Sequence, residues 1–513
     1  MSLADKIRDL EEKTSNLMKG GGDAAVAKQR SQGKMTARER IDVLLDSDSF
    51  RETDLFARHR CTDFDMAEKE IPADGVITGF GTVDGRKVFV YSQDFTAAGG
   101  AMGAGTAKKI CKIMDMAMAA GAPVIGIIDS GGARIQEGVD SLSGYGQIFF
   151  RNSRMSGRVP QISVIAGPCA GGAAYSPALT DIVIMVEKTG KMFITGPSVI
   201  EVTTGEVVDE EELGGAFAHA SVSGVAHLTA SDEKEALRKA ASALSYLPSS
   251  DRDRVPYSFY AEEDESRPAL EEIVPDDERI PYDMKDVIAE IFDKDSFFEL
   301  QPLFADNLIT GFARLGGLSV GVIANQPYSL GGCLDISASV KGARFIRMCD
   351  AFNLPLVNLV DVPGFMPGVD QEHSGIIRHG AKMLYAYSVA EVPKFTVILR
   401  KAFGGSYLAM CSKDLGADLV LAWPAAQIAV MGAEGAAGII FRREIAGAED
   451  PEAKRAEMVE MYKEKFETPY PAAERGHADM VIRPRDTRSE LLTASELFAK
   501  KAGAGVNRGN MPL

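Results

Sequence analysis

The sequence lacks the signs of a disulfide framework, a zinc-ligand cluster, a membrane-spanning segment and a signal peptide. Its 513 residues include only six cysteines, widely spaced and without a CxxC pair. This pattern favours reduced thiols over a disulfide framework, and the absence of ligand pairs argues against a zinc ribbon. No apolar run approaches the roughly 20 residues that span a bilayer, and the polar N-terminus lacks the apolar core of a signal peptide. These absences predict a cytoplasmic protein with no direct membrane insertion.

Positive charge is also scarce relative to negative charge. The chain has 56 Lys and Arg residues against 73 Asp and Glu residues, which gives a formal charge of −17. Such a field repels polyanions, so a nucleic-acid partner is not expected. An anionic ligand would have to meet local lysines or a set of backbone N–H groups.

The side-chain signatures of several common sites are missing as well. Gly33-Lys34 and Gly190-Lys191 are each followed by Met, so neither forms a Walker A loop. Leu408 stands where a GxSxG nucleophile elbow needs its second glycine. The six histidines form no HExxH motif. The sequence therefore predicts neither a bound metal nor a hydrolase nucleophile.

Glycine, in contrast, is abundant: 51 residues, often paired and set among apolar runs. Four short apolar runs suit strands that are covered on both faces. They lie at 88–91, 124–128, 162–165 and 182–186. The stretches 106–120 and 145–155 between them have helical composition. Strand–helix alternation of this kind predicts an α/β fold.

An internal repeat fixes the domain organisation. Ile77-Thr78-Gly79-Phe80 returns as Ile309-Thr310-Gly311-Phe312, an offset of 232, and further landmarks return at 232 or 233. These landmarks pair Gly99 with Gly331, Pro123 with Pro355, Asp129 with Asp361, Pro160 with Pro393, and Gly171 with Gly404. The chain is therefore predicted to contain two tandem copies of one α/β fold, residues 1–255 and 256–513. The proline-rich stretch 249–286 is expected to be a linker or surface crossover.

Two equivalent glycine turns carry the candidate chemistry. Gly171-Gly172 and Gly404-Gly405 each follow a predicted buried strand and precede a predicted helix. The N–H groups at a helix start have no intrahelical acceptor, and small residues let a ligand oxygen come close. This is a way to build an oxyanion hole from backbone alone, and two copies indicate two oxyanions.

Five motifs now point to a family. They lie at 130–138, 167–173, 361–368, 375–382 and 429–436. On these motifs, from about residue 5 to its end, the chain resembles the carboxyltransferase (β) subunits of biotin-dependent acyl-CoA carboxylases of the propionyl-CoA carboxylase type, and the related methylmalonyl-CoA decarboxylases. The resemblance implies two crotonase-like (ClpP/crotonase) domains, with acyl-CoA on the N-terminal one and biotin on the C-terminal one. It also implies a homo-hexamer, a trimer of dimers, with active sites between the N-domain of one subunit and the C-domain of its partner.

The resemblance also implies roles for residues at matching motif positions. Gly171 and Gly172 would hold the thioester enolate, while Gly405 and Ser406, which is often Ala in the family, would hold the ureido oxygen of biotin. Further contacts are expected at Gly131, Gly132, Ala133 and Leu408 for the acyl-CoA, and at Gly364, Phe365 and Gly404 for biotin. Because N1 of biotin can take the α-proton, no side-chain base is required.

Partners follow from motifs that the chain does not contain. It has no Met-Lys-Met biotin attachment motif and no ATP-grasp glycine loop. Carboxybiotin must therefore come from a separate biotin carboxyl carrier and a biotin carboxylase subunit. In a decarboxylase the partner would be a membrane sodium-pump subunit.

Other interpretations remain open. The same chemistry could run backwards, from methylmalonyl-CoA to biotin. A crotonase-type hydratase or hydrolase and a non-catalytic scaffold are more distant alternatives. Among individual residues, Asp129 and Asp361 are expected to cap helices. Lys108, Lys109 and Lys112 are expected near one helix face, which is either plainly solvated or contacts the phosphates of CoA.

Overall fold

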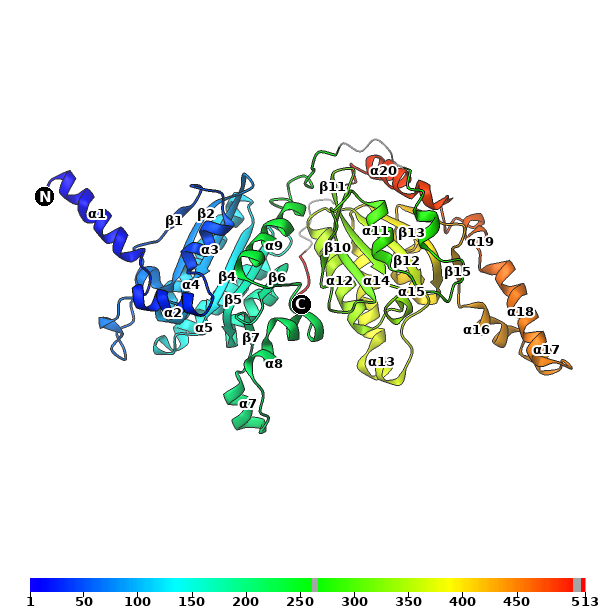
Figure 1. The fold of residues 1–513 in the computed structure, drawn as a ribbon, viewed down its shortest axis with the longest axis horizontal. Helices are drawn as coiled ribbons and strands as arrows, with labels where there is room; N and C mark the ends of the chain where they lie inside the picture. The colour runs from blue at the N-terminus through cyan, green and yellow to red at the C-terminus, as the bar shows by residue number, and fades with distance from the viewer. Residues whose placement is uncertain (261–265, 502–508, 513) are drawn as a thin grey trace. The chain divides into compact units, whose positions relative to one another are not determined.

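The computed structural model describes residues 1–260, 266–501 and 509–512 (Figure 1). The chain forms two compact units. Unit 1 contains residues 1–254 together with 509–512, and unit 2 contains the described residues from 255 to 501. The division falls one residue before the boundary expected from the sequence. The C-terminal residues join unit 1 because Asn510 N donates to Ser156 Oγ at 2.8 Å.

Unit 1 is built on an eight-stranded sheet of order β1-β2-β3-β4-β5-β6-β8, with β7 beside β5. β2 and β3 form an antiparallel hairpin, and from β3 to β8 the neighbouring strands are parallel. The bounds are β1 Arg51–Thr53, β2 Val76–Val83, β3 Arg86–Gln93, β4 Val124–Ser130, β5 Gln161–Ala170, β6 Ile182–Val186, β7 Lys191–Phe193 and β8 Leu228–Ala230. The four predicted strands of this region are confirmed.

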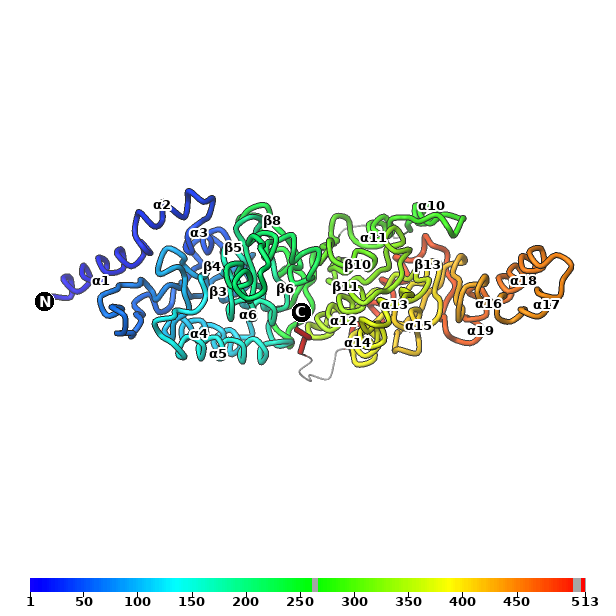
Figure 2. Tube along the Cα trace, turned by 90° about the horizontal axis from the view of Figure 1, so that it is seen from below, coloured from blue at the N-terminus to red at the C-terminus, as the bar shows by residue number. Residues whose placement is uncertain are grey.

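The helices of unit 1 cover both faces of this sheet, with α4 and α5 on one face and α3 on the other (Figure 2). A capping box begins α3: Glu39 N donates to Thr36 Oγ1 at 3.3 Å, and Thr36 N donates to Glu39 Oε2 at 2.7 Å. The bounds are α1 Leu3–Leu17, α2 Asp23–Ser31, α3 Ala37–Leu44, α4 Ala104–Ala120, α5 Val139–Met155, the 3₁₀ turn η5 Gly171–Ala174, α6 Tyr175–Ala178, α7 Pro197–Thr204, α8 Glu210–Gly214 and α9 Glu233–Tyr246.

Unit 2 repeats this sheet strand for strand, in the order β16-β14-β13-β12-β11-β10-β9 with β15 beside β13. Even an irregularity is duplicated: the register shift between Ile128 and Ser130 in unit 1 returns between Val360 and Val362. The bounds are β9 Phe298–Leu300, β10 Leu308–Leu315, β11 Leu318–Asn325, β12 Leu356–Val362, β13 Lys394–Phe403, β14 Leu419–Ala422, β15 Gln427–Ala429 and β16 Met480–Val481. The predicted duplication is therefore confirmed.

The helices of unit 2 include part of the expected linker. Leu270, Tyr282 and Met284 are buried in the core of unit 2, so the prediction of a surface crossover over 249–286 is wrong there. Proline breaks this stretch into pieces too short to show a period, although they pack inward. The bounds are α10 Leu270–Ile273, α11 Met284–Ile291, α12 Ile336–Ala351, α13 Val369–Ser374, α14 Ile376–Val389, α15 Gly404–Ala409, α16 Ala433–Ile440, α17 Arg442–Ala446, α18 Pro451–Phe466, α19 Tyr470–Glu474 and α20 Thr487–Leu497.

Candidate active site

Both glycine turns lie where a central strand of a sheet ends. β5 ends at Ala170 and Gly171 follows with φ +63°; β13 ends at Phe403 and Gly404 follows with φ +59°. Only glycine adopts this left-handed conformation without strain, which explains the first glycine of each pair. The second glycines of the two pairs, Gly172 and Gly405, correspond to each other in the repeat.

The N–H groups that follow these turns are the candidate oxyanion donors. Gly172 lies in the first turn of η5, and Gly405 and Ser406 lie in the first turn of α15, where N–H groups lack an intrahelical acceptor. The strict equivalent of Ser406 is Ala173. The hydroxyl of Ser406 is buried and donates to Phe403 O at 2.7 Å, so Ser406 can serve the site only through its backbone.

A second pair of turns follows the neighbouring strands β4 and β12. In unit 1, Gly131 N donates to Gly99 O at 2.9 Å and Gly132 N donates to Ser130 Oγ at 3.2 Å. These two N–H groups are thus engaged within the protein, in contrast to a helix start. Ala133 follows them and forms a parallel bridge with Met102.

The matching turn in unit 2 contains Gly364 and Phe365. Gly364 O accepts from Leu334 N at 3.0 Å, and Phe365 forms the parallel bridge with Leu334 that corresponds to the one at Ala133. The phenyl ring of Phe365 lies beside Gly405, since a Cβ built on Gly405 would be 3.9 Å from Phe365 Cε2. The structure therefore brings the predicted biotin-side residues Gly364, Phe365, Gly404, Gly405 and Ser406 into one region of unit 2.

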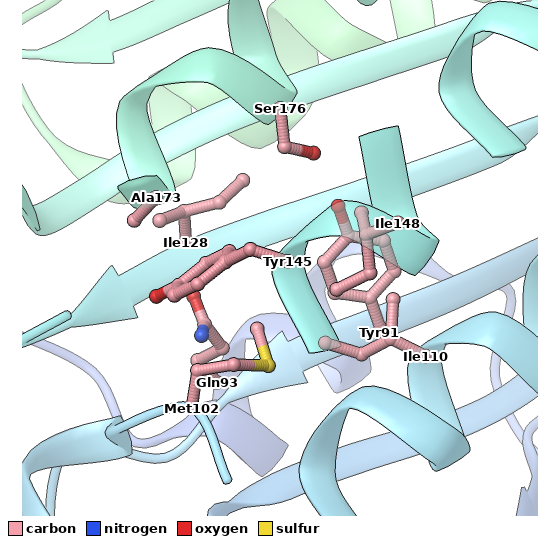
Figure 3. A pocket seen from close by; sticks show the side chains of 9 residues that line it. All are labelled: Tyr91, Gln93, Met102, Ile110, Ile128, Tyr145, Ile148, Ala173 and Ser176. Atoms are coloured by element: carbon pink, nitrogen blue, oxygen red, sulfur yellow. The ribbon is translucent and has the colours of Figure 1, made fainter. Parts of the chain in front are cut away.

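A small cavity of about 20 Å³, room for about one water molecule, lies beneath the Gly171–Ala174 turn (Figure 3). Tyr145 of α5 crosses it and is only 4% exposed. Burial raises the pKa of Tyr145 well above its ordinary value, and the nearby Ser130 hydroxyl opposes part of that increase. Tyr145 therefore stays neutral. The cavity is lined by Tyr91, Gln93, Met102, Ile110, Ile128, Tyr145, Ile148, Ala173 and Ser176.

The strand-end aspartates do not cap helices, so that prediction is wrong. Asp129 accepts from Lys34 Nζ at 2.7 Å and from Arg40 Nη2 at 2.8 Å, and all three side chains are buried. Asp361 accepts from Arg400 Nε at 3.0 Å and is also buried. A buried carboxylate needs a compensating charge, and both aspartates have one.

Arg134 is a site-shaping residue that sequence reasoning missed. Its buried guanidinium donates to Asp74 Oδ1 and to Glu137 Oε1, both at 2.7 Å, and Glu137 Oε2 accepts from Ala104 N at 2.7 Å, where α4 begins. Burial raises the pKa of Asp74, although Arg134 offsets part of the effect. The network ties the Gly131–Ala133 turn to α4. Asp74 is 60 residues away in the sequence, so no local spacing signalled it.

The three lysines of α4 do not share one face. Lys109 is buried and donates to Ala73 O at 2.7 Å and Val76 O at 2.6 Å; burial lowers its pKa to about 8. Lys112 is exposed and pairs with Asp54 at 3.0 Å, while Lys108 is exposed on the same side. Only Lys108 and Lys112 thus remain available to an anionic ligand.

The remaining observations concern the exposure of Leu408 and two features that the described residues do not show. Leu408, the expected acyl-pocket residue, lies on α15 and is 38% exposed. Over the described ranges, no helix is both long and apolar enough to cross a membrane, and no three His, Cys, Asp or Glu side chains are grouped to bind a metal ion.

The chain is similar over its whole length to subunits of acyl-CoA carboxylases and decarboxylases. Residues 28–510 match the carboxyl transferase domain family. The chain is 56% identical to the methylmalonyl-CoA decarboxylase subunit alpha of Veillonella parvula, covering 100% of both chains. It is also 56% identical to the propionyl-CoA carboxylase carboxyltransferase subunit of Haloferax mediterranei, again over 100% of both.

The same holds for a solved structure. The transcarboxylase 12S hexamer with methylmalonyl-coenzyme A and methylmalonic acid bound has a TM-score of 0.97 and 53% identity, over 100% of this chain and 99% of that one. The match extends over both duplicated sheets of the fold. The chain belongs to the carboxyl transferase domain family and is a biotin-dependent acyl-CoA carboxyltransferase.

Proposed function

We propose that the chain moves CO2 from carboxybiotin, carried on a partner protein, to the α-carbon of a short-chain acyl-CoA such as propionyl-CoA. The duplicated glycine turn is the observation that carries the proposal. Gly171-Gly172 and Gly404-Gly405 each lead from a buried strand into a helix start, so the chain offers two sets of backbone donors. A reaction with two enolate oxygens, one on each substrate, requires two such sets.

Unit 1 is assigned to the acyl-CoA. The N–H groups of Gly171 and Gly172 donate to the thioester oxygen, and the turn at Gly131, Gly132 and Ala133 forms the neighbouring wall. Backbone donors are uncharged and fixed by the fold, so they need no reorganisation when negative charge develops on that oxygen.

Unit 2 is assigned to biotin. The N–H groups of Gly405 and Ser406 donate to the ureido oxygen, and Gly364, Phe365 and Gly404 surround that position. The exposure of Gly405 and the absence of a Cβ leave room for a ring oxygen to approach. Bound carboxybiotin would supply the carboxyl group and, once that group has left, the acceptor for the α-proton, so this chain's residues need only hold and orient the two substrates.

The assembly follows the relatives. The transcarboxylase 12S structure is a hexamer, and we infer a homo-hexamer, a trimer of dimers, for this chain. Biotin would arrive on a biotin carboxyl carrier protein loaded by a biotin carboxylase subunit. Light scattering on the purified chain tests the assembly, with six times 55.0 kDa as the expected mass.

The reverse direction is the second candidate, because one similar relative is a methylmalonyl-CoA decarboxylase subunit and another a propionyl-CoA carboxylase subunit at the same 56% identity. Donors that stabilise an enolate serve both directions, by microscopic reversibility. Affinity purification from the native cells separates them. An ATP-dependent biotin carboxylase supports the forward direction, and integral-membrane partners support the reverse.

The direct test uses free biotin as an acceptor. Methylmalonyl-CoA is incubated with the chain, and propionyl-CoA formation is measured with and without biotin. Biotin-dependent formation is expected, and its loss in Gly172→Leu places the reaction at Gly172. Water addition to an enoyl-CoA without biotin would instead identify a hydratase. A panel of short acyl-CoAs with the biotinylated partner then determines the preferred acyl group.

A further inference from the structure

Tyr145 supports the turn that contains Gly172. A Cβ built on Gly172 would lie 3.4 Å from Tyr145 Cδ2 and 3.6 Å from Cγ, in ordinary van der Waals contact, so the ring lies beside Gly172 with about the space of one methyl group between them. The ring also lines the cavity beneath the next residue, Ala173 (Figure 3). Its buried hydroxyl makes no hydrogen bond of ordinary geometry within the described ranges, although the Ser130 hydroxyl lies near enough to lower its pKa.

Unit 2 has no aromatic residue at the equivalent helix position. Four of the six buried positions of α5 recur as buried positions of α14 with a constant offset of 235. They pair Ser141 with Ile376, Tyr145 with Gly380, Ile148 with Met383, and Asn152 with Tyr387. By this register, Gly380 takes the place of Tyr145.

Phe365 fills the space that Gly380 leaves. A Cβ on Gly380 would lie 3.1 Å from Phe365 Cε1, and a Cβ on Gly405 would lie 3.9 Å from Phe365 Cε2. The position equivalent to Phe365 in unit 1 is Ala133. The aromatic ring therefore comes from the helix in unit 1 and from the turn in unit 2, yet in both units it lies within 4 Å of the position that a Cβ of the second glycine would take.

We propose that Tyr145 is a positioning residue whose ring, not its hydroxyl, fixes the orientation of the Gly172 N–H, and that Phe365 does the same for Gly405. The inference rests on the proposed function where it assigns those N–H groups to enolate oxygens. The exchange of Tyr145/Ala133 for Gly380/Phe365 supports it, because two different sequences place a ring at one point. Phe365 has no hydroxyl, so the shared element is the aromatic face.

Steady-state kinetics of Tyr145 variants test the proposal in the assembled protein. Tyr145→Leu keeps an apolar side chain but removes the flat face; kcat is expected to fall about 10- to 100-fold while KM for the acyl-CoA stays within about twofold, since a displaced donor acts on the transition state. Tyr145→Phe is expected to retain kcat within about twofold. Ala133→Phe with Tyr145→Gly rebuilds the unit 2 arrangement and should recover kcat relative to Tyr145→Gly alone.

Controls make each outcome decisive. Ile110→Val trims the same cavity from α4 and should leave kcat unchanged, with hexamer mass and melting temperature checked for every variant. Wild-type kcat in Tyr145→Leu, or an equal loss in Tyr145→Phe, overturns the proposal. If Tyr145→Leu does not fold, Phe365→Leu tests the positioning role in unit 2 instead, and a retained kcat in that variant overturns the proposal.

A readout independent of turnover separates this proposal from the proposed function. Amide hydrogen exchange over residues 171–178 should be faster in Tyr145→Leu than in wild type and unchanged in Tyr145→Phe. If wild type transfers no carboxyl group while exchange responds in this way, the proposed function fails and the positioning role stands. If transfer is normal and exchange does not respond, only the positioning role fails.

Discussion

Asp129 in unit 1 and Asp361 in unit 2 end equivalent strands, yet their charges are balanced from different parts of the chain. Asp129 is paired with Lys34 and Arg40, which precede the sheet, and Arg40 is also paired with Glu233 at 2.6 Å. Asp361 is paired with Arg400, which lies on the adjacent strand β13.

The residue at the Arg400 position of unit 1 explains the difference. At the repeat offset of 233 it is Gly167, and a Cβ there would collide with the carboxylate of Asp129. The cation must therefore come from elsewhere, and residues 34 and 40 supply it. As a result, the N-terminal segment is fastened to the strand ends of unit 1, whereas the sheet of unit 2 balances its own charge. Both copies therefore keep a buried aspartate with a cation beside it, but the cation comes from different positions in the two copies.

The largest expected effect is on stability. Asp129→Asn leaves Arg40 paired with Glu233 alone and removes the carboxylate that pairs with Lys34, and breaking a buried pair in this way costs about 3–5 kcal/mol. Asp361→Asn removes the acidic partner of Arg400 alone and should lower the free energy of unfolding by less. Urea unfolding followed by circular dichroism gives the ranking. Asp115→Asn, which breaks an exposed pair with Arg151, is the control and should cost less than about 1 kcal/mol. A greater loss of stability in Asp361→Asn than in Asp129→Asn would contradict the proposed difference between the two units.

The next effect is on catalysis. Gly172→Leu and Gly405→Leu each place bulk over an N–H donor, and kcat should fall about 100- to 1000-fold in a protein that still folds. The two copies should differ in the substrate affected: KM for acyl-CoA in Gly172→Leu, and KM for biotin in Gly405→Leu. The reverse pattern would exchange the assignments of the two units, and full activity would remove the glycine concerned from the site.

A smaller effect is expected on substrate choice. Leu408→Asp puts a charge where an apolar acyl chain is expected, and the ratio of kcat/KM between propionyl- and butyryl-CoA should change about tenfold. Leu408→Val, which stays apolar, should change it less. An unchanged ratio in both variants would remove Leu408 from the acyl pocket.

The smallest effect is expected at Ser406, where unit 2 can be made to match Ala173 of unit 1. Ser406→Ala keeps the N–H and removes only the hydrogen bond to Phe403 O. Activity should be retained, with a stability loss of about 0.5–1.5 kcal/mol. A tenfold fall in kcat would show that the hydroxyl, not only the backbone, serves the site.

Local patterns explain why much of this architecture was predictable. The strand at 124–128 is continuously apolar because both faces of β4 are covered, and Gly171 and Gly404 recur because each must adopt a left-handed turn. The capping box at Thr36 depends on contacts three residues apart. Constraints of this kind act over a few residues, or repeat at a fixed offset, so they are visible in the chain itself.

The sequence by itself determined the doubled α/β fold, its buried strands and the two glycine turns that follow β5 and β13. Only the tertiary structure decided which side chains surround those turns: the cations that balance Asp129, the contact of Arg134 with Asp74, and the ring that lies near each second glycine. The physical reason is that backbone conformation is set locally, whereas filling a buried space or balancing a buried charge requires only that some residue reach it. Lys34 and Arg400, or Tyr145 and Phe365, meet the same need from unrelated positions in the chain.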